Sequence, residues 1–548
     1  MAEKNVYKIG IVPRGDPKTR KGKELDVRPL WVRDAYRVLS ENSDVEFVFY
    51  EHEENVVNLE EMINDLCPED NSTLRDKITI EKTTLDVLMN GDIIDQDGNK
   101  VSSFGEAGRR DNNIRETPYG LALEHHEQGN IDAVISALST GDMLKGAYLK
   151  FGAMVTPPII LVAPTEKITN GFSDIKYVTV LDIGATALSN SKMTEKYLKQ
   201  FGIIGKEYAS AFLGVAEPRV ALVGDGLDES VRNNVASFLT ERIDASYIGE
   251  RSAKEIFSGD IDVFLMDGFK GNVSFLKTIE ATTSSLKKVY SRVVKDYLSL
   301  IKRPLSLFRN YGSFLRKLNF FKEENFELCK DNDDFSYVRI PTKAKGKETV
   351  LLMNRNGDFH SETIDNVIKD IVNFDNPKIG LLSNGEEVGK NGKGSDYLNE
   401  VHACLADKYG DDFIGFVEPK GNNGLYEGNV DVIITDYSTG KVMMNVVESA
   451  VSLYLSMMHR AITGSIKKLS LKPLRAYRKV KNPSNYDGRP FVGLKPIGGD
   501  VENPPRVIKV HGGSKDFYYP LNNALSLMRE GKSVEFYKAL DEHFGKKK

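Results

Sequence analysis

The chain has 548 residues, of which 40% are hydrophobic and 28% charged, so it can bury several domain-sized cores. Its formal net charge of −5 at pH 7 disfavours a general nucleic-acid-binding protein and predicts no nucleic-acid partner. Three cysteines are too few for a disulfide framework, and no apolar run approaches the roughly 18 residues that span a bilayer. These features predict a cytoplasmic protein that is soluble or peripheral to a membrane.

Short apolar runs recur along the chain, and each ends in small or acidic residues. Helical stretches such as 117–129 and 193–214 lie between them. Continuous apolar strands that alternate with helices are typical of a parallel sheet covered on both faces. The sequence therefore predicts a three-layer α/β fold with a doubly wound, mostly parallel sheet. The predicted strands are 7–12, 45–50, 131–138, 177–185, 219–225, 261–268, 378–385 and 430–436.

The turns after these strands are the candidate ligand site. In doubly wound sheets, ligands bind outside the carboxyl ends of the strands, where such turns gather. The turns in question are 135–142, 181–187, 222–226, 265–272 and 381–387, and most of them contain glycine next to a polar residue.

Part of the sequence occurs twice. Residues 217–230 match 376–389, and DGFKGN at 267–272 corresponds to DYSTGK at 436–441. A further segment, 350–368, aligns without gaps on 507–525. The period of roughly 160 residues is far longer than a solenoid repeat and indicates duplication of a domain-sized half. The predicted division is an N-terminal half at 1–215, a first C-terminal half at 216–375 and a second, diverged copy at 376–548.

A basic segment follows the turn of the first copy. Residues 285–322 hold ten Lys or Arg against the single Asp296, and Pro304 and Gly312 break the pattern, which predicts a helical hairpin. Such a surface is suited to an anionic membrane, or it packs as a dimer-forming hairpin with a solvated basic face.

The order of several motifs resembles the bacterial phosphate acyltransferases of phospholipid synthesis. The motifs are SALSTG, LDIGA, LGVAEPRV, a GEE turn, DGFKGN, YDGRPFVG and HGGS. The resemblance covers nearly the whole chain, with the C-terminal half represented twice. It implies a fold akin to phosphotransacetylases and isopropylmalate dehydrogenases, a dimer, and loose membrane association. It also implies transfer of a fatty acyl group from acyl carrier protein to inorganic phosphate.

The chemistry of that transfer assigns roles to the turns. A phosphate nucleophile needs an anion pocket, which backbone N–H groups at helix N-termini provide, and Ser139, Thr140 and Gly141 fit this role. The thioester carbonyl needs a donor for its developing oxyanion, and Asn272 is the candidate. The resemblance implies a lysine partner after the LDIGA motif, and this sequence offers Lys192, displaced by an apparent insertion.

The remaining predicted substrate-binding residues are Arg115, Asp267, Gly268, Gly271, Gly385 and Glu386. Arg115, which precedes a helix, is expected to bind substrate phosphate or to form an ion pair at the helix start. No histidine stands at metal-ligand spacing from a carboxylate or cysteine, so we predict no metal. No G-x-G-x-x-G follows the first strand, and Thr435 stands where a Walker A loop needs glycine, so we predict no organic cofactor.

The two copies differ in complementary ways. The first keeps DGFKGN but has Leu227 where the second has Glu386, whereas the second has Tyr437 and Lys441 in place of Gly268 and Asn272. One hypothesis is that the copies pack as an intrachain pseudo-dimer with a single composite site. The other is that one copy is only structural, with homodimerisation still open.

The resemblance, together with these residues, predicts acyl phosphate synthesis. A competing hypothesis is a catalytically inactive relative that serves as a membrane-surface scaffold or acyl-chain binding protein. A third is a transacylase that prefers coenzyme A thioesters.

Overall fold

The structure is a computed structural model. It describes residues 6–13, 27–66, 72–87, 92–95, 97–103, 112–138, 140–169, 172–184, 186, 191–224, 227–279, 329–330, 335–342, 347–354, 368–369, 376–382, 396–420, 422–447, 490–510 and 517–545. The chain forms two compact units. The first comprises Met1–Pro157, Glu207–Val215 and Asn482–Lys548, and the second comprises Pro158–Lys206 and Ala216–Lys481.

The first unit is built on a parallel sheet with the strand order β19-β7-β1-β2-β3. These strands are β1 (Tyr7–Val12), β2 (Val45–His52), β3 (Ile78–Thr83), β7 (Ala133–Ser136) and β19 (Val507–Lys509). The last strand comes from the far end of the sequence and pairs with β7 through Val507 and Val134.

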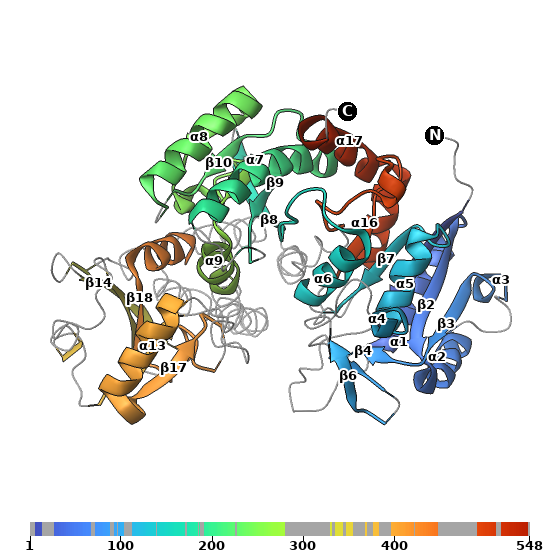
Figure 1. Ribbon diagram of the computed structural model, residues 1–548, viewed down its shortest axis with the longest axis horizontal. Coiled ribbons are helices and arrows are strands. Elements are labelled where there is room, and N and C mark those ends of the chain that lie inside the picture. The colour runs from blue at the N-terminus through green and yellow to red at the C-terminus, as the bar shows by residue number, and fades with distance from the viewer. Residues whose placement is uncertain are drawn as a thin grey trace, which may run out of the picture. The chain divides into compact units, whose positions relative to one another are not determined.

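Helices cover both faces of this sheet, as Figure 1 shows. On one face, α1 (Arg28–Glu41), α2 (Glu53–Leu66) and α16 (Tyr518–Arg529) pack on side chains such as Ile11 and Phe47. On the other face, α5 (Pro118–Glu127) and α6 (Thr140–Phe151) pack on the alternate side chains, among them Val12 and Val48. The predicted three-layer α/β arrangement is therefore confirmed, because the strands are apolar on both faces.

Smaller elements complete the first unit. A three-stranded antiparallel sheet contains β4 (Asp86–Val87), β5 (Asp92–Ile94) and β6 (Lys100–Ser103). The remaining helices are α3 (Ser72–Arg75), α4 (Asn112–Arg115) and α17 (Lys532–Phe544). The aromatic ring of Phe536 in α17 packs against Tyr208 and Phe212, near the end of α7 (Ser191–Leu213).

The second unit contains two further sheets. The first of them has the order β11-β10-β12-β9-β8, and only the pair β8 and β9 is antiparallel. Its strands are β8 (Leu161–Thr169), β9 (Phe172–Leu181), β10 (Val220–Leu222), β11 (Tyr247–Glu250) and β12 (Val263–Leu265), with α8 (Glu229–Ile243) between β10 and β11.

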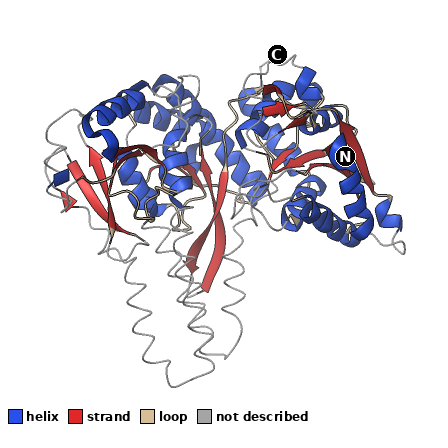
Figure 2. Ribbon diagram, turned by 90° about the horizontal axis from the view of Figure 1, so that it is seen from below, coloured by secondary structure: helices blue, strands red, loops and turns tan. Residues whose placement is uncertain are grey.

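The second of them has the order β13-β14-β15-β18-β16-β17. Its strands are β13 (Cys329–Lys330), β14 (Phe335–Pro341), β15 (Glu348–Asn354), β16 (Ile379–Leu382), β17 (Phe413–Val417) and β18 (Val432–Asp436). The pairs β13–β14 and β14–β15 are antiparallel, and the other pairs, including β15–β18, are parallel. Helix α13 (Asp396–Tyr409) covers one face, and a helix at 437–447 covers the other. Figure 2 shows helices beside the strands of each unit, and one long pair of strands that extends away from the helices.

The two sheets of this unit have the same topology. Reading the second sheet from β17 to β14 gives the same succession of parallel and antiparallel neighbours as reading the first from β11 to β8. The duplication inferred from the sequence thus extends to the strands of both copies, which we call the first copy (β8–β12) and the second copy (β14–β18).

The strand register corrects one of the sequence alignments. The gapless match of 350–368 to 507–525 is wrong as a structural equivalence, because β15 occupies the place of β9 and not that of β19. The sheets also cross the predicted boundaries at residues 215 and 375. β9, before residue 215, pairs with β12 after it, and β15, before residue 375, pairs with β18 after it. As limits of the duplicated sequence, those boundaries stay a prediction. The predicted helical hairpin at 285–322 lies outside the described residues.

The two copies pack against each other through corresponding helices. Val273, which follows the turn of the first copy, is buried in the apolar core of the second copy beside Ile433. Its sequence counterpart Val442 is buried in the core of the first copy beside Phe264. This reciprocal exchange is typical of a two-fold related interface. Each valine is 0% exposed, so each burial contributes about 1.5–3 kcal/mol.

Two glycines at equivalent positions provide a matched test of this packing. A Cβ on Gly271 would lie 1.7 Å from the backbone oxygen of Asp182, whereas a Cβ on Gly440 would lie 2.4 Å from the side-chain Cγ of Met353. A methionine side chain moves more easily than a backbone carbonyl. We therefore expect Gly271→Ala to destabilise the chain by about 1–3 kcal/mol and Gly440→Ala by clearly less. Urea unfolding of both variants checks this, and equal losses would contradict the predicted difference.

Candidate active site

The carboxyl edge of the first sheet carries polar side chains on several strands. Glu51 and His52 end β2, Thr83 ends β3 and Ser136 ends β7, and all four are buried. Arg28 at the start of α1 stands 3.9 Å from Glu51 (Nη1 to Oε2). Because the strands are parallel, these ends share one edge, which is the edge predicted to hold ligands.

The predicted anion turn begins at this edge. Ser136 Oγ donates a hydrogen bond to the backbone oxygen of Val12 (3.1 Å) and accepts one from the N–H of Leu138 (3.3 Å). Thr140 then opens α6, and Gly141 is exposed in its first turn, with open space where a Cβ would stand. The N-terminus of a 12-residue helix presents unsatisfied N–H groups, which suits an anion. Ser139 lies outside the described residues.

Lys509 braces the same turn, and sequence reasoning missed it. Its Nζ donates to the backbone oxygen of Ala137 (3.2 Å) and to that of Val510. The lysine ends β19, so tertiary pairing of β19 with β7 is what brings this cation to the turn. The signal available in the sequence was a lysine at the end of the apolar run 507–510.

In the second unit, the turn after β12 positions Asn272. Asp267 is the N-cap of α9 (Gly268–Lys270), and its Oδ1 accepts a hydrogen bond from the N–H of Lys270 (3.1 Å). Its Oδ2 pairs with the Lys270 ammonium at 2.9 Å, and both side chains are largely buried. Gly268 is buried at the first helical position, and Gly271 opens the π-helical segment η4 (Gly271–Lys277), which contains Asn272. The predicted residues Asp267, Gly268, Gly271 and Asn272 thus share one capped turn.

Two predicted residues occupy less central positions. Lys192 is exposed in the first turn of α7. Arg115 ends α4, with its side chain 58% exposed and its Nε 3.7 Å from Glu124 Oε2. Glu124 lies near the end of α5 and not at its start, so this pair differs from the expected ion pair at the helix start. The role of Arg115 in phosphate binding stays a prediction. Gly385 and Glu386 lie outside the described residues.

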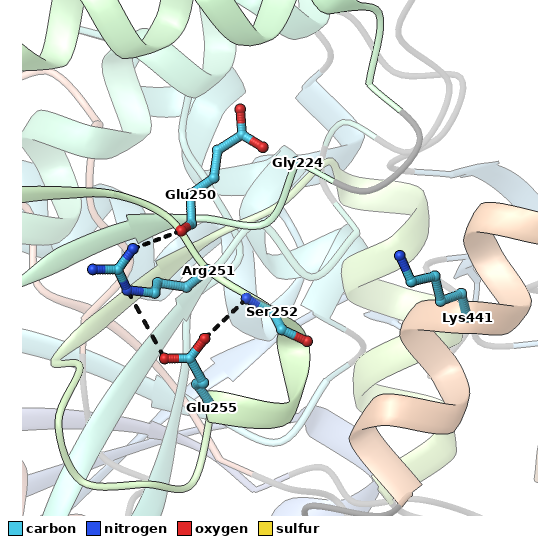
Figure 3. A pocket seen from close by; sticks show the side chains of 6 residues that line it. All are labelled: Gly224, Glu250, Arg251, Ser252, Glu255 and Lys441. Atoms are coloured by element: carbon cyan, nitrogen blue, oxygen red, sulfur yellow. Dashed lines mark hydrogen bonds and ion pairs between the residues drawn. The ribbon is translucent and has the colours of Figure 1, made fainter.

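A cleft of about 460 Å³ lies between the two copies (Figure 3). The first copy contributes Gly224 after β10, and the second contributes Lys441 from the helix at 437–447. Lys441 faces across the cleft toward Gly224 and Ser252. The complete lining is Gly224, Glu250, Arg251, Ser252, Glu255 and Lys441.

The carboxylates of this cleft are engaged by neighbouring cations and N–H groups. Glu250 Oε2 is 3.4 Å from Arg232 Nη1, and Glu255 Oε1 accepts from the N–H of Ser252 (3.2 Å). Burial, and secondarily the Glu250 charge, raises the pKa of Tyr247 to about 12, so this phenol stays protonated at neutral pH. A Cβ on Gly224 would stand 2.3 Å from Glu250 Oε2, the end of an exposed side chain that can move away.

The equivalent turn of the second copy keeps its cap but differs at several side chains. Asp436 Oδ1 accepts from the N–H of Thr439 (2.9 Å), as Asp267 does from Lys270. The strand register shows which residue of the second copy corresponds to Asp182. Asp182 follows β9 beside the end of β12, and Met353 of β15 has the same place beside β18. Tyr437 and Lys441 replace Gly268 and Asn272. The predicted glycines and asparagine are therefore all present only in the turn of the first copy.

Among the described residues, no group of three or more His, Cys, Asp or Glu side chains gathers as metal ligands would. Within the same residues, no helix has the length and apolarity needed to cross a bilayer.

Comparison with known proteins places the chain in a family. The family model described as "Fatty acid synthesis protein" matches residues 94–307 and again 338–519. The chain belongs to this family of acyltransferases. Phosphate acyltransferases of Campylobacter concisus and Campylobacter hominis are 31% and 27% identical over 267 and 283 residues, which is 48% and 50% of this chain and 72% and 77% of theirs. That of Lactococcus lactis is 29% identical over 42% of this chain and 69% of its own.

Solved structures with some likeness include two phosphotransacylases. A branched-chain phosphotransacylase from Enterococcus faecalis is 11% identical, covers 47% of this chain and 79% of its own, and has a TM-score of 0.26. A phosphotransacetylase from Streptococcus pyogenes is 17% identical, covers 49% and 81%, and has a TM-score of 0.30.

The position of Lys509 generates a prediction about phosphate. If the turn that begins α6 holds inorganic phosphate, loss of the cation that braces it weakens that binding. We expect Lys509→Ala to raise the KM for phosphate about tenfold, and Lys509→Arg to raise it less, because the charge is kept. Steady-state kinetics at varied phosphate measures this. An unchanged KM in Lys509→Ala would remove Lys509 from the phosphate site.

Proposed function

We propose that this chain transfers a fatty acyl group from acyl carrier protein to inorganic phosphate, giving acyl phosphate for phospholipid synthesis. Membership of the phosphate acyltransferase family supports acyl transfer. The capped turn at Asp267–Asn272 supports the assignment of the reaction to particular residues. Only the first copy has both glycines and the asparagine of this turn.

The proposed reaction needs few parts. A phosphate oxygen attacks the thioester carbonyl carbon, the C–S bond breaks, and the carrier thiolate leaves and takes up a proton. The carbonyl oxygen becomes an oxyanion in the intermediate, and the Asn272 amide is a suitable donor for it. The turn at Ser139–Gly141 is proposed to orient phosphate through backbone N–H groups, with Arg115 and Lys192 as additional cations.

The packing of the copies supports a composite site. The cleft brings Lys441 of the second copy to Gly224 of the first, and the two copies exchange Val273 and Val442. In the sequence, Lys441 corresponds to Asn272, and the turn after β10 corresponds to 383–387. The same two-fold relation predicts that Asn272 acts together with Gly385 and Glu386 of the second copy.

This arrangement bears on the proposed partners. An intrachain pseudo-dimer supplies within one chain the contact that two subunits would otherwise make, so it is favoured over a homodimer at this surface. Association with an anionic membrane through 285–322 stays a prediction, as does the cytoplasmic location.

Release of carrier thiol tests the function. Acyl-acyl carrier protein should release free thiol only when phosphate is added, and Asn272→Ala should lower kcat roughly 100-fold or more. Lys441→Ala, at the matching position of the second copy, is the control and should retain activity. Phosphate-independent or absent release by the wild-type chain favours the inactive scaffold or acyl-chain binding protein, and faster release from acyl-coenzyme A identifies that thioester as the donor.

The composite site has its own test. Glu386→Ala should reduce acyl phosphate formation by about as much as Asn272→Ala, because both are proposed to serve one site. Rapid-quench measurement of acyl phosphate compares the two variants under saturating substrates. Full activity of Glu386→Ala would leave the second copy with a structural role only.

A further inference from the structure

We propose that Asp182 is a positioning residue that sets the location of Asn272 in the first copy. The inference rests on the proposed function of Asn272 and adds a residue that neither the sequence motifs nor the family match assigned.

Asp182 follows β9 directly and is 0% exposed. Its Oδ1 accepts hydrogen bonds from the N–H groups of Ile159 (2.9 Å) and Gly184 (3.2 Å). Its Oδ2 accepts from the N–H of Thr186 (2.7 Å) and from the Thr186 hydroxyl (2.8 Å). A buried carboxylate is tolerated only with such donors, and here they come from two chain segments. The side chain thus ties Gly184 and Thr186 to Ile159, which lies just before β8.

The same residue touches the helix that contains Asn272 through its backbone. Its N–H donates to the backbone oxygen of Met266 at the end of β12 (3.1 Å). Its own backbone oxygen lies so close to Gly271 that a Cβ there would stand at 1.7 Å. Gly271 immediately precedes Asn272, so a displacement of Asp182 displaces the asparagine backbone with it.

The second copy shows what remains without the carboxylate. Met353 takes the register position of Asp182, and it meets Gly440 with a flexible side chain instead of a fixed carbonyl. In that copy the position of Asn272 is taken by Lys441. The carboxylate and the asparagine therefore occur together in one copy and are replaced together in the other, as expected if one serves the other.

An amide at position 182 tests the proposal. In Asp182→Asn one oxygen becomes an N–H₂ group that faces N–H donors, so the loop can no longer be held by both oxygens. We expect kcat to fall roughly 10- to 100-fold, because small misplacements of a catalytic group have effects of this size. The KM values for phosphate and acyl-carrier protein should stay within about threefold, because the binding surfaces are kept. Met353→Leu, the matched change in the second copy, should leave kcat unchanged.

A milder pair of variants covers the case in which Asp182→Asn does not fold. Thr186→Val removes one donor to the carboxylate, whereas Thr186→Ser keeps it, so kcat should fall in the former and be restored in the latter. Full activity of a folded Asp182→Asn, or of Thr186→Val, overturns the proposal. An equal loss in Met353→Leu also overturns it, because the effect would then be one of general packing.

Hydrogen exchange provides a readout that does not depend on catalysis. Asp182→Asn or Thr186→Val should speed amide exchange at 183–186 and at 268–272 but not at 437–441. Unchanged exchange at 268–272 contradicts the positioning role even if the chain is active. If the wild-type chain releases no thiol while the exchange result holds, the proposed function fails and the link between Asp182 and the helix stands.

Discussion

The architecture of the second unit depends on the reciprocal burial of two valines. Val273 enters the core of the second copy and Val442 enters that of the first, so neither copy has a complete core on that face by itself. The contact is reinforced by polar pairs between the copies, such as Ser274 Oγ to the backbone oxygen of Thr439 (3.0 Å) and Asn445 Nδ2 to Ser252 Oγ (3.3 Å). Because the exchange involves the helices that follow the two turns, the packing also determines which turns face which copy.

Once two copies share one interface within a chain, they are free to diverge. The first keeps the buried carboxylate of Asp182 and a close contact between Gly271 and the Asp182 backbone, which leaves no room for a side chain at position 271. At the corresponding positions the second copy has Met353, Tyr437 and Lys441. The capping carboxylates Asp267 and Asp436 are kept in both, because each helix needs its first N–H groups satisfied regardless of catalysis.

Much of the fold was accessible from residue patterns. All eight predicted strands are present. They could be recognised because a parallel strand that is buried on both faces has a continuous run of apolar residues. Strands such as β8 and β14 were missed because they are antiparallel edge or near-edge strands, in which polar residues interrupt the run. The alignment of 350–368 with 507–525 failed because two apolar strands that end in polar turns look alike wherever they lie in a fold.

The sequence by itself determined the α/β class, the duplication and the turn at Asp267–Asn272, since these depend on local periodicity and on short-range capping. Only the tertiary structure decided the roles available to Lys509 and Asp182. Lys509 reaches the turn before α6 because β19 pairs with β7 across 370 or so residues of chain. Asp182 touches the Asn272 helix because β9 and β12 are neighbours in a sheet. Both are long-range pairings, which no local pattern encodes.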